Sequence, residues 1–520
     1  MTFAQEPIVK LEGVISEPYD LAVATARTCY SAKGIIRTRD VKISEKARVL
    51  RDKIADSTRD AGHLTTRQHA HFVFSLDHVS RHFIWSFLHS HPYYNSEQVS
   101  QRYVKVSPGN YTVPKLSEAH TALFTQTLNQ QMLDYQRLIE MCLPQVEKRF
   151  FDIFPSRQTT AEQYSQSLQK RAYEIARSVL GVATHAYLYH TISALTLMRY
   201  HRLCEYFDVP LETKIVVEKM VHEVKKMDPE FARELVDPYP LEQTPEYKML
   251  AERGLVTVGH KDFIKEFDAG LAPYQYAKLV DYKINATQTL SQAARSVLGL
   301  TQLQMSDAEA LDLLLSPAKN SYYSDTLNLN SLTKLNRVLY HAHYTFRKKI
   351  SHAADSQDQR HRMVPGSRPV LFRHYTGDLD YVAPLVIRET PELMEFFEKS
   401  LTNTFAAINQ LLHDGVKPED ALYLLPNAFP VRFEESGDLL NLHHKWKARS
   451  CYTAQEEIYF ATIEELLQVN EVHPQIAKHI LAPCYLRQMA KVTPYCPEGD
   501  RFCGVRVWKQ DLEKYLTRTL

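Results

Sequence analysis

The sequence predicts a protein of mixed helices and strands (α/β or α+β) that is built from two related domains in tandem. The segment HAHFVF at residues 69–74 recurs as HAHYTF at residues 341–346. Lys10-Leu11 recurs as Lys278-Leu279, in the same order and again about 270 residues further along the chain. Matches in constant order at a nearly constant offset indicate a duplicated gene. The alternative is two unrelated α/β domains with coincidental matches.

The first half begins with elements that the hydrophobic pattern defines. Phe72, Phe74 and Leu76 recur at every second position, which predicts a half-buried strand over 69–76. Residues 79–88 form an apolar run after this strand. A short strand and two helices are predicted before it, over residues 8–12, 17–30 and 45–61.

Each half also contains a long amphipathic helix, predicted over residues 120–150 and 390–415 from spaced Leu, Met and Phe. Residues 205–275 are rich in charge and broken by several prolines, so we interpret them as a helical connector. The predicted domains are therefore residues 1–204 and 276–520, with the connector between them.

The composition excludes several classes of protein. Of 520 residues, 44% are hydrophobic, and 62 Lys and Arg balance 61 Asp and Glu. This balance argues against a general nucleic-acid or anionic membrane surface. No apolar run approaches the ~20 residues that cross a bilayer, and the first residues do not resemble a signal peptide. Seven cysteines do not suggest a disulfide scaffold, so we expect a cytoplasmic protein with reduced thiols.

The stretch HSHPYYNSEQVSQRY, residues 89–103, is the strongest candidate for a ligand site. It gathers hydrogen-bond donors and acceptors around one fixed cation, Arg102. An arginine can hold a phosphate through two bonds, and serine or glutamine can hydrogen bond to a nucleobase or sugar. We therefore expect a pocket for a small anionic ligand. The alternative is a polar loop after a buried helix.

Several motifs together resemble the flavin-dependent thymidylate synthases. They are ATARTCYS (24–31), GHLTT (62–66), HAHFVF (69–74), VSR (79–81), SEQVSQRY (96–103), ARSVLG (176–181) and RSCYTAQEEI (449–458). The resemblance implies two domains of that family's fold with long helices. It also implies methylation of dUMP to dTMP by methylenetetrahydrofolate, with FAD as cofactor and NADPH as a reductant.

Each half keeps a different part of the family's pattern. The second half has the literal triplet Arg360-His361-Arg362, whereas the first half has His89-Ser90-His91 at that place. The family's N-x-R pair is replaced by Asp438 and Leu440. Because the losses are complementary, two chains would imitate the four-subunit assembly of the family. We therefore expect a homodimer that mimics a tetramer, with no membrane or nucleic-acid partner.

The resemblance implies a role for individual residues. Ser100 would lie beside the uracil as the catalytic residue, although it could equally be a turn-forming serine. The substrate-binding residues would be Glu97, Gln98, Arg102, Arg177, Gln357, Arg360 and Arg449. The cofactor-binding residues would be His63, Thr65, His361, Arg362 and Gln455. For His63, the alternative is a loop histidine that bonds to the backbone.

Four cysteines near the end of the chain are candidates for a zinc site. They are Cys451, Cys484, Cys496 and Cys503. Thiolates from separate loops can form a tetrahedral zinc centre, but the spacing is not the C-x2-C pattern. Free reduced cysteines are the favoured interpretation, so zinc is possible but not expected.

Three functions remain open at this stage. The first is FAD-dependent thymidylate synthesis. The second is a diverged, non-catalytic protein of the same fold that binds a nucleotide or serves in assembly. The third is a flavin enzyme that acts on another nucleotide. The basic-aromatic run at 341–352 is interpreted as a strand with a solvated end and not as an RNA-binding segment.

Overall fold

The computed structural model describes residues 3, 5–15, 17–89 and 91–520, and it contains two antiparallel sheets. The strand order is β1-β2-β4-β3 in the first sheet and β5-β6-β7 in the second. The strands are β1 (Ile8–Val14), β2 (His71–Ser80), β3 (Tyr94–Gln98), β4 (His185–Ser193), β5 (Ala277–Tyr282), β6 (His343–Ser351) and β7 (Pro430–Asp438). Since both sheets are antiparallel and flanked by helices, the fold belongs to the α+β class.

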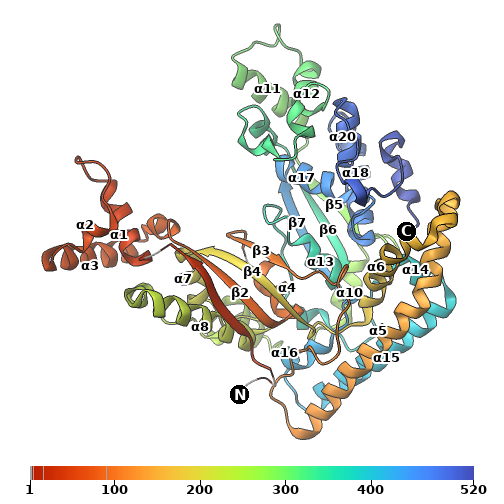
Figure 1. The fold of residues 1–520 in the computed structure, drawn as a ribbon, viewed down its shortest axis with the longest axis horizontal. Helices are drawn as coiled ribbons and strands as arrows, with labels where there is room; N and C mark the ends of the chain where they lie inside the picture. Colours follow the sequence, from red (N-terminus) through yellow and green to blue (C-terminus); the bar gives the residue numbers. More distant parts are fainter. Residues whose placement is uncertain (1–2, 4, 16, 90) are drawn as a thin grey trace.

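Some helices of the first half and the connector lie along the first sheet, and others lie away from it (Figure 1). They are α1 (Pro18–Thr28), α2 (Thr38–Val41), α3 (Glu45–Asp60), α4 (Arg81–His89), α5 (Glu118–Ile153), α6 (Ser165–Ala176), α7 (Ala194–Arg202), α8 (Pro210–Met227), α9 (Pro245–Glu252) and α10 (Lys261–Asp268). The strand and helices predicted before residue 62, the strand over 69–76 and the first long helix are thus confirmed, with boundaries shifted by a few residues.

The second half repeats this pattern of helices around the second sheet. They are α11 (Ala286–Leu298), α12 (Asp307–Leu315), α13 (His352–Asp358), α14 (Leu385–Arg388), α15 (Pro391–His413), α16 (Pro418–Ala421), α17 (Leu439–Arg449), α18 (Glu456–Val472), α19 (Pro474–Ala477) and α20 (Pro483–Met489). The second long helix and the strand inside residues 341–352 are confirmed.

The second sheet repeats three strands of the first, β1-β2-β4, in the same order and with the same register between the first two strands. Leu11 of β1 lies opposite Phe74 of β2, and a bulge follows in β1. Leu279 of β5 lies opposite Phe346 of β6, and a bulge follows in β5. Leu11 and Leu279, like the two phenylalanines, are residues that the sequence repeat pairs. The two tandem domains therefore share one topology, which a duplication produces.

A buried serine–glutamate pair marks the same corner in both halves. Ser80, at the end of β2, donates from its backbone N–H and its hydroxyl to the carboxylate of Glu212 on α8, at 2.7 and 2.6 Å. Ser351, at the end of β6, binds Glu457 on α18 in the same way. Each serine hydroxyl also accepts from the N–H three residues ahead and so caps the next helix. By this criterion α8 is the counterpart of α18.

The halves are joined by backbone hydrogen bonds that follow an approximate two-fold symmetry. Val182 N–H donates to Leu425 O, and Asn427 N–H donates to Leu180 O, both at 2.8 Å. Ala183 N–H donates to Tyr423 O at 2.8 Å, and Ala428 N–H donates to Ser178 O at 2.9 Å. We call segments 178–183 and 423–428 the central junction. Helices α5 and α15 pack side by side next to it (Figure 1), where Gln131 on α5 donates to Leu424 O.

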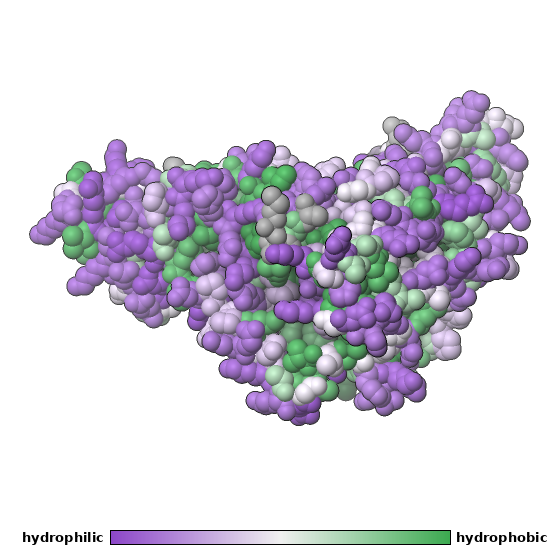
Figure 2. Space-filling view, turned by 90° about the horizontal axis from the view of Figure 1, so that it is seen from below, coloured by the Kyte–Doolittle hydropathy of each residue, from purple (hydrophilic) through white to green (hydrophobic). Residues whose placement is uncertain are grey.

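Two parts of the molecule project away from the junction. Helices α1 to α3 form one arm, and helices α11 and α12 form the other (Figure 1). A space-filling view shows a mostly polar face with apolar patches near its centre and its edges (Figure 2). None of the helices in the described residues is long and apolar enough to span a membrane.

The half-buried Glu419 on α16 makes stability depend on pH. Its Oε1 is buried without a hydrogen-bond partner in the described part of the chain. Burial, together with the carboxylates of Asp208 and Asp420, raises the pKa of Glu419 to about 8. The folded chain therefore keeps a proton that the unfolded chain releases near pH ~4.3. Folding stability from this group is complete below that pH and is lost as the pH rises through 8.

Glu419→Gln should remove this loss. We expect the variant to be more stable than the parent at pH 9 by on the order of 2 kcal/mol, with a much smaller difference at pH 5. Urea unfolding at both pH values measures the effect. Glu395→Gln, at an exposed glutamate of α15, is the matched control. Equal pH dependence in the parent and in Glu419→Gln would contradict this assignment.

Candidate functional site

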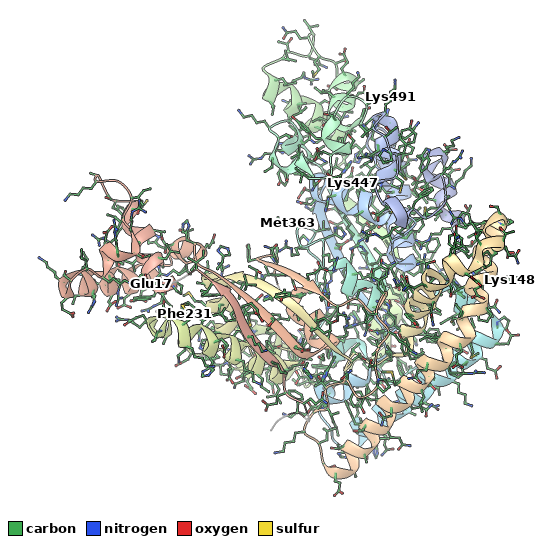
Figure 3. All side chains as sticks on the ribbon, viewed as in Figure 1. Glu17, Lys148, Phe231, Met363, Lys447 and Lys491 are labelled. Carbon is green, nitrogen blue, oxygen red and sulfur yellow. The ribbon has the colours of Figure 1, made fainter. Side chains whose placement is uncertain are left out.

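The triplet of the second half lies against a strand of the first half. It follows α13 directly, and Arg360 forms an ion pair with Glu97 of β3. Arg362 donates to Asn95 Oδ1 at 2.9 Å, and its guanidinium lies 5.1 Å from the centre of the Tyr94 ring. Met363, the next residue, lies on the side of the molecule that faces the space between the two arms (Figure 3). Both halves thus contribute to one surface.

A small cavity of about 220 Å³ opens at this contact. Its polar walls come from Glu97 and Gln98 of the first half and from Gln359, Arg360 and Arg362 of the second half. Arg360 is exposed, whereas Gln359 is buried. The size suits one ring or one phosphate group better than an entire dinucleotide.

Arg449, at the end of α17, is held against the triplet by residues of its own half. Its Nε donates to His361 Nε2 and its Nη2 donates to Gln357 O, both at 2.8 Å. Burial, with repulsion from Arg102 and Arg360, lowers the pKa of Arg449 to about 10. The three guanidiniums therefore lie close enough to repel one another, although they come from different halves.

Arg102 and Arg177 complete this group, which we call the arginine cluster (Arg102, Arg177, Arg360 and Arg449). Arg102 pairs with Glu174, Nε to Oε1 at 3.0 Å, and donates to Thr453 O of the second half at 2.9 Å. Arg177 is buried, and burial lowers its pKa to about 10 despite the nearby Glu174 carboxylate. Its side chain makes no hydrogen bond within the described residues.

The charges of the cluster do not cancel. Four guanidiniums meet Glu97 and Glu174, but Glu174 also pairs with Arg171, and Glu97 is exposed. An anion would reduce the excess of positive charge, and guanidiniums bind phosphate oxygens through paired bonds. The cluster can therefore hold a phosphate group.

The loop before Arg102 is held by a residue that the sequence did not single out as binding. Arg81, at the start of α4, donates to Gln98 Oε1 at 3.0 Å and to Val99 O at 2.6 Å. The Ser100 hydroxyl accepts from the backbone N–H of Arg102 at 3.2 Å. This is the turn-forming bond that the sequence offered as the alternative role of Ser100, and it fixes the loop that carries Arg102.

The predicted cofactor residues lie in different places. His361 accepts from Arg449, and burial with that guanidinium holds its pKa well below the usual range, so it is neutral. The Gln455 side chain caps α18 by accepting from Ile458 N–H at 2.9 Å. His63 and Thr65 are exposed beside the first arm and make no hydrogen bond or ion pair with the arginine cluster in the described chain.

These positions test whether one chain can hold a flavin. Arg360 and Arg362 offer cations for its phosphates, but the cavity beside them is about 220 Å³. His63 and Thr65 do not reach it. The residues of one chain thus fit a phosphate group and do not enclose a complete flavin. Ser90, in the first-half counterpart of the triplet, lies outside the described residues.

A buried ion network that the sequence did not reveal supports the triplet. Lys348 Nζ lies 3.1 Å from Asp358, 3.2 Å from Glu435 and 2.9 Å from Glu465. Lys445 Nζ lies 2.8 Å from Asp358 and also pairs with Glu435. Burial raises the pKa of Asp358, but the two ammonium groups outweigh burial and hold it well below the usual range. Asp358 directly precedes the segment that carries the triplet.

Glu174 is a second residue that sequence reasoning missed. It accepts from Arg102 and from Arg171, and it lies midway between Arg171 and Arg177 at a spacing of three residues. Opposite charges three apart on a helix face one another. The spacing of three residues was therefore the feature of the sequence that could have identified Glu174.

The four late cysteines line one small cavity, together with Thr453 and Phe502. Burial raises the pKa of the Cys484 thiol to about 12 and that of Cys503 to about 11. Within the described chain, no group of three or more His, Cys, Asp or Glu side chains is placed to hold a metal ion. The zinc site that the sequence left possible thus gains no support from the arrangement of these side chains.

Comparison with known proteins gives a consistent result. The family described as "Thymidylate synthase complementing protein" matches residues 10–230 and 278–475. A flavin-dependent thymidylate synthase of Geobacter sulfurreducens is 35% identical over 173 residues, which cover 32% of this chain and 70% of that protein. One of Pyrococcus furiosus is 27% identical over 171 residues, which cover 31% of this chain and 68% of that protein.

Among solved structures, a UMP/dUMP methylase, PolB from Streptomyces cacaoi bound with 5-Br dUMP, aligns with a TM-score of 0.32 and 19% identity. The alignment covers 45% of this chain and 96% of that chain.

Removing one ammonium group from the buried network should destabilise the second half. Lys445→Met leaves Asp358 and Glu435 with less compensating charge, so we expect a loss of about 3–5 kcal/mol in the free energy of unfolding. Chemical denaturation measures it. Lys447→Met on the same helix is the control, because Lys447 makes no ion pair with a carboxylate in the described structure. Equal losses in both variants would show that the network does not stabilise the fold.

Proposed function

The chain belongs to the thymidylate synthase complementing protein family, and we propose that it methylates dUMP to dTMP. The methylene group would come from methylenetetrahydrofolate, and FAD, reduced by NADPH, would supply the hydride. The arginine cluster would be the nucleotide site. The observation that carries the proposal is that two halves with different surviving motifs bring their arginines to one place.

The residues of the cluster would have distinct roles. Arg102 and Arg177 of the first half and Arg360 and Arg449 of the second would hold the nucleotide phosphate. Their excess positive charge supports this role, as does the side chain of Arg177, which makes no hydrogen bond in the part of the chain that the structure describes. Ligand binding would then release Glu97 from Arg360, since a phosphate competes for the same guanidinium.

The remaining predicted residues would act around the base. Gln98, the last residue of β3 and held by Arg81, and Ser100, on the loop before Arg102, would contact the uracil. Fixed donors at that place would polarise the ring, so that no cysteine nucleophile is required. Gln357, whose carbonyl accepts from Arg449, would set the position of that arginine.

The flavin would be bound between two chains. His63 and Thr65 lie beside the arm of α1 to α3, away from Arg360 and Arg362 of the same chain. A second chain would bring its own His63 and Thr65 to this triplet. Gln455 and His361 make local hydrogen bonds, so they would stabilise the backbone around the flavin site.

The arms also support a homodimer. Large apolar side chains are exposed on them, which is unusual unless a partner covers them. On the first arm, Tyr30 is 92% and Ile43 79% exposed, and near the second, Leu303 is 100% and Leu332 80% exposed. We propose that a second copy of this chain covers both arms in the cytoplasm.

The duplication suggests a division of the chain that differs slightly from the one expected from composition. Residues 1–204 and 276–520 would each form a domain, joined by the connector 205–275. Because the pair Ser80–Glu212 repeats the pair Ser351–Glu457, we propose that α8 belongs to the first domain and that the connector begins after it.

A second candidate function is nucleotide binding without flavin chemistry. Asp438, at one of the N-x-R positions, caps α17 by accepting from Asn441 N–H at 3.0 Å, and Leu440 at the other is buried. Neither side chain is available to a cofactor. A protein that binds dUMP but remains colourless after incubation with FAD would favour this candidate.

Loss of one arginine should weaken nucleotide binding. For Arg449→Ala we expect dUMP affinity to fall at least about tenfold, because one charge-assisted hydrogen bond contributes ~1.5–3 kcal/mol. Calorimetric titration with dUMP measures it. Arg137→Ala, at an exposed arginine of α5, is the control. Unchanged affinity in Arg449→Ala would remove the cluster from the proposed site.

The dimer should dissociate when charge is placed on the second arm. For the double variant Leu303→Glu/Leu332→Glu we expect light scattering to give the mass of one 60.2 kDa chain, whereas the parent gives twice that mass. Leu133→Glu, at a 59% exposed leucine of α5, should remain dimeric. A monomeric parent chain would refute the proposal.

A further inference from the structure

Four cysteines meet at one place that the proposed function does not use. Cys451 lies in the turn after α17, Cys484 lies at the start of α20, and Cys496 and Cys503 lie in the loop that follows α20. All four line one cavity of about 20 Å³, which has room for about one water molecule. The thiols are free, although they come from three separate elements and surround so small a space.

The four thiols are close enough to affect one another's ionisation. Burial raises the pKa of the Cys484 thiol to about 12, and the charge of Cys451 adds to this increase. Burial likewise raises the pKa of Cys503 to about 11, again with a contribution from Cys451. The pKa of Cys496 is raised by burial and also by Cys451. Cys451 is therefore the common neighbour of the other three thiols.

A group of thiols in a protein can hold a metal ion or form a disulfide. A metal centre needs three or more ligands, and in the described chain no three His, Cys, Asp or Glu side chains are arranged to hold one. A disulfide needs only two sulfur atoms and an oxidant that reaches them. Cys451, Cys496 and Cys503 are partly exposed, so an oxidant can reach this group. Disulfides in reducing compartments are mostly transient and serve in catalysis or redox sensing.

The turn that carries Cys451 also contacts the arginine cluster. Thr453 O accepts from Arg102 Nη2 at 2.9 Å. The hydroxyl of the same threonine lies within hydrogen-bond distance of the Cys451 sulfur, at 3.2 Å. Ala454 N–H donates to Cys451 O at 2.9 Å, so residues 451–454 form one tight turn. A movement of Cys451 toward another sulfur would therefore displace the carbonyl group that holds Arg102.

Few groups in the described chain hold the Arg102 side chain. Its Nε and Nη2 donate to the Glu174 carboxylate at 3.0 and 3.3 Å, and Nη2 also donates to Thr453 O. Burial lowers the pKa of Arg102, but the charges of Glu174, Tyr103 and Cys451 outweigh burial and raise it. The Cys451 sulfur is thus also a close neighbour of this guanidinium. Without the Thr453 carbonyl, Arg102 would depend on Glu174 for its position.

We propose that the four cysteines form a redox-sensitive site, in which Cys451 bonds reversibly to one of the other three thiols and thereby loosens Arg102. The effect on a ligand rests on the proposed function, in which the arginine cluster binds the nucleotide. The oxidant is a small-molecule disulfide. One cysteine thiolate attacks it, forms a mixed disulfide and releases one small thiol, and the second cysteine thiolate then displaces the other small thiol. The two cysteines lose two electrons and two protons, which reduce the small disulfide to two thiols.

Treatment of the full-length chain with oxidised glutathione, followed by alkylation and peptide mass spectrometry, tests the proposal. We expect a disulfide that includes Cys451, and dithiothreitol should restore the free thiols. In the oxidised chain, hydrogen exchange of the peptides around Thr453 and Arg102 should become faster. The affinity for dUMP, measured by calorimetric titration, should fall about tenfold, because one hydrogen bond to a guanidinium is lost.

Two serine variants separate this effect from oxidation elsewhere in the chain. Cys451→Ser keeps a hydroxyl beside Thr453, so it should bind dUMP as the reduced parent does, but its affinity should not respond to oxidised glutathione. Cys29→Ser, at an exposed cysteine of the first arm, should respond as the parent does. A response that persists in Cys451→Ser would overturn the proposal.

The parent chain alone can also overturn it. A map in which every disulfide leaves out Cys451 does so, as does a disulfide at Cys451 that leaves hydrogen exchange around Arg102 unchanged. One zinc ion per purified chain does so too, because thiolates that hold a metal do not form this disulfide. A reduced chain that fails to bind dUMP contradicts the proposed function instead, while the disulfide map and hydrogen exchange still decide the redox site.

Discussion

The central junction is the constraint on which the rest of the structure depends. Segments 178–183 and 423–428 exchange backbone hydrogen bonds in symmetric pairs, as an isologous contact between two subunits does. Backbone donors and acceptors do not depend on side-chain identity, so the two halves can diverge in sequence and still dock in one orientation. That orientation determines which residues after α13 meet β3, and which residues after α4 meet segment 366–370.

This orientation creates two places where residues of both halves meet, and the chemistry of the two places differs. At one, both halves supply guanidiniums, and Glu97 and Glu174 compensate only part of their charge. At the other, a cavity of about 1110 Å³ between α4, α7 and segment 366–370, aromatic rings dominate and the cations are fewer. The buried network around Lys348 and Lys445 lies beneath the first place, because Asp358 belongs both to the network and to the segment that carries the triplet. Breaking that network would therefore affect the position of the triplet before it affected any ligand contact.

The sequence predicted what local pattern controls. Alternation at Phe72 and Phe74 predicted β2, the spaced apolar residues predicted α5 and α15, and the repeat predicted two domains of one topology, all of which the structure contains. The sequence did not predict the roles of residues that depend on partners far away in the chain. Lys348 sits in a basic run that resembles a solvated strand end, yet its ammonium group is buried among three carboxylates. The backbone bonds of the junction leave no side-chain signal, so no motif could indicate how the halves meet.

The serine–glutamate pairs and the arginines of the cluster meet two different physical requirements. Ser80–Glu212 and Ser351–Glu457 occur in both halves, because each sheet needs its own buried corner whether or not a ligand is nearby. The arginines of the cluster instead come two from each half, Arg102 and Arg177 from the first and Arg360 and Arg449 from the second. Arg177 and Arg449 already carry lowered pKa values of about 10 from burial. Further guanidiniums in the same place would add to this cost unless an anion offset it, so a composite site with two arginines from each half limits the charge that burial must accommodate.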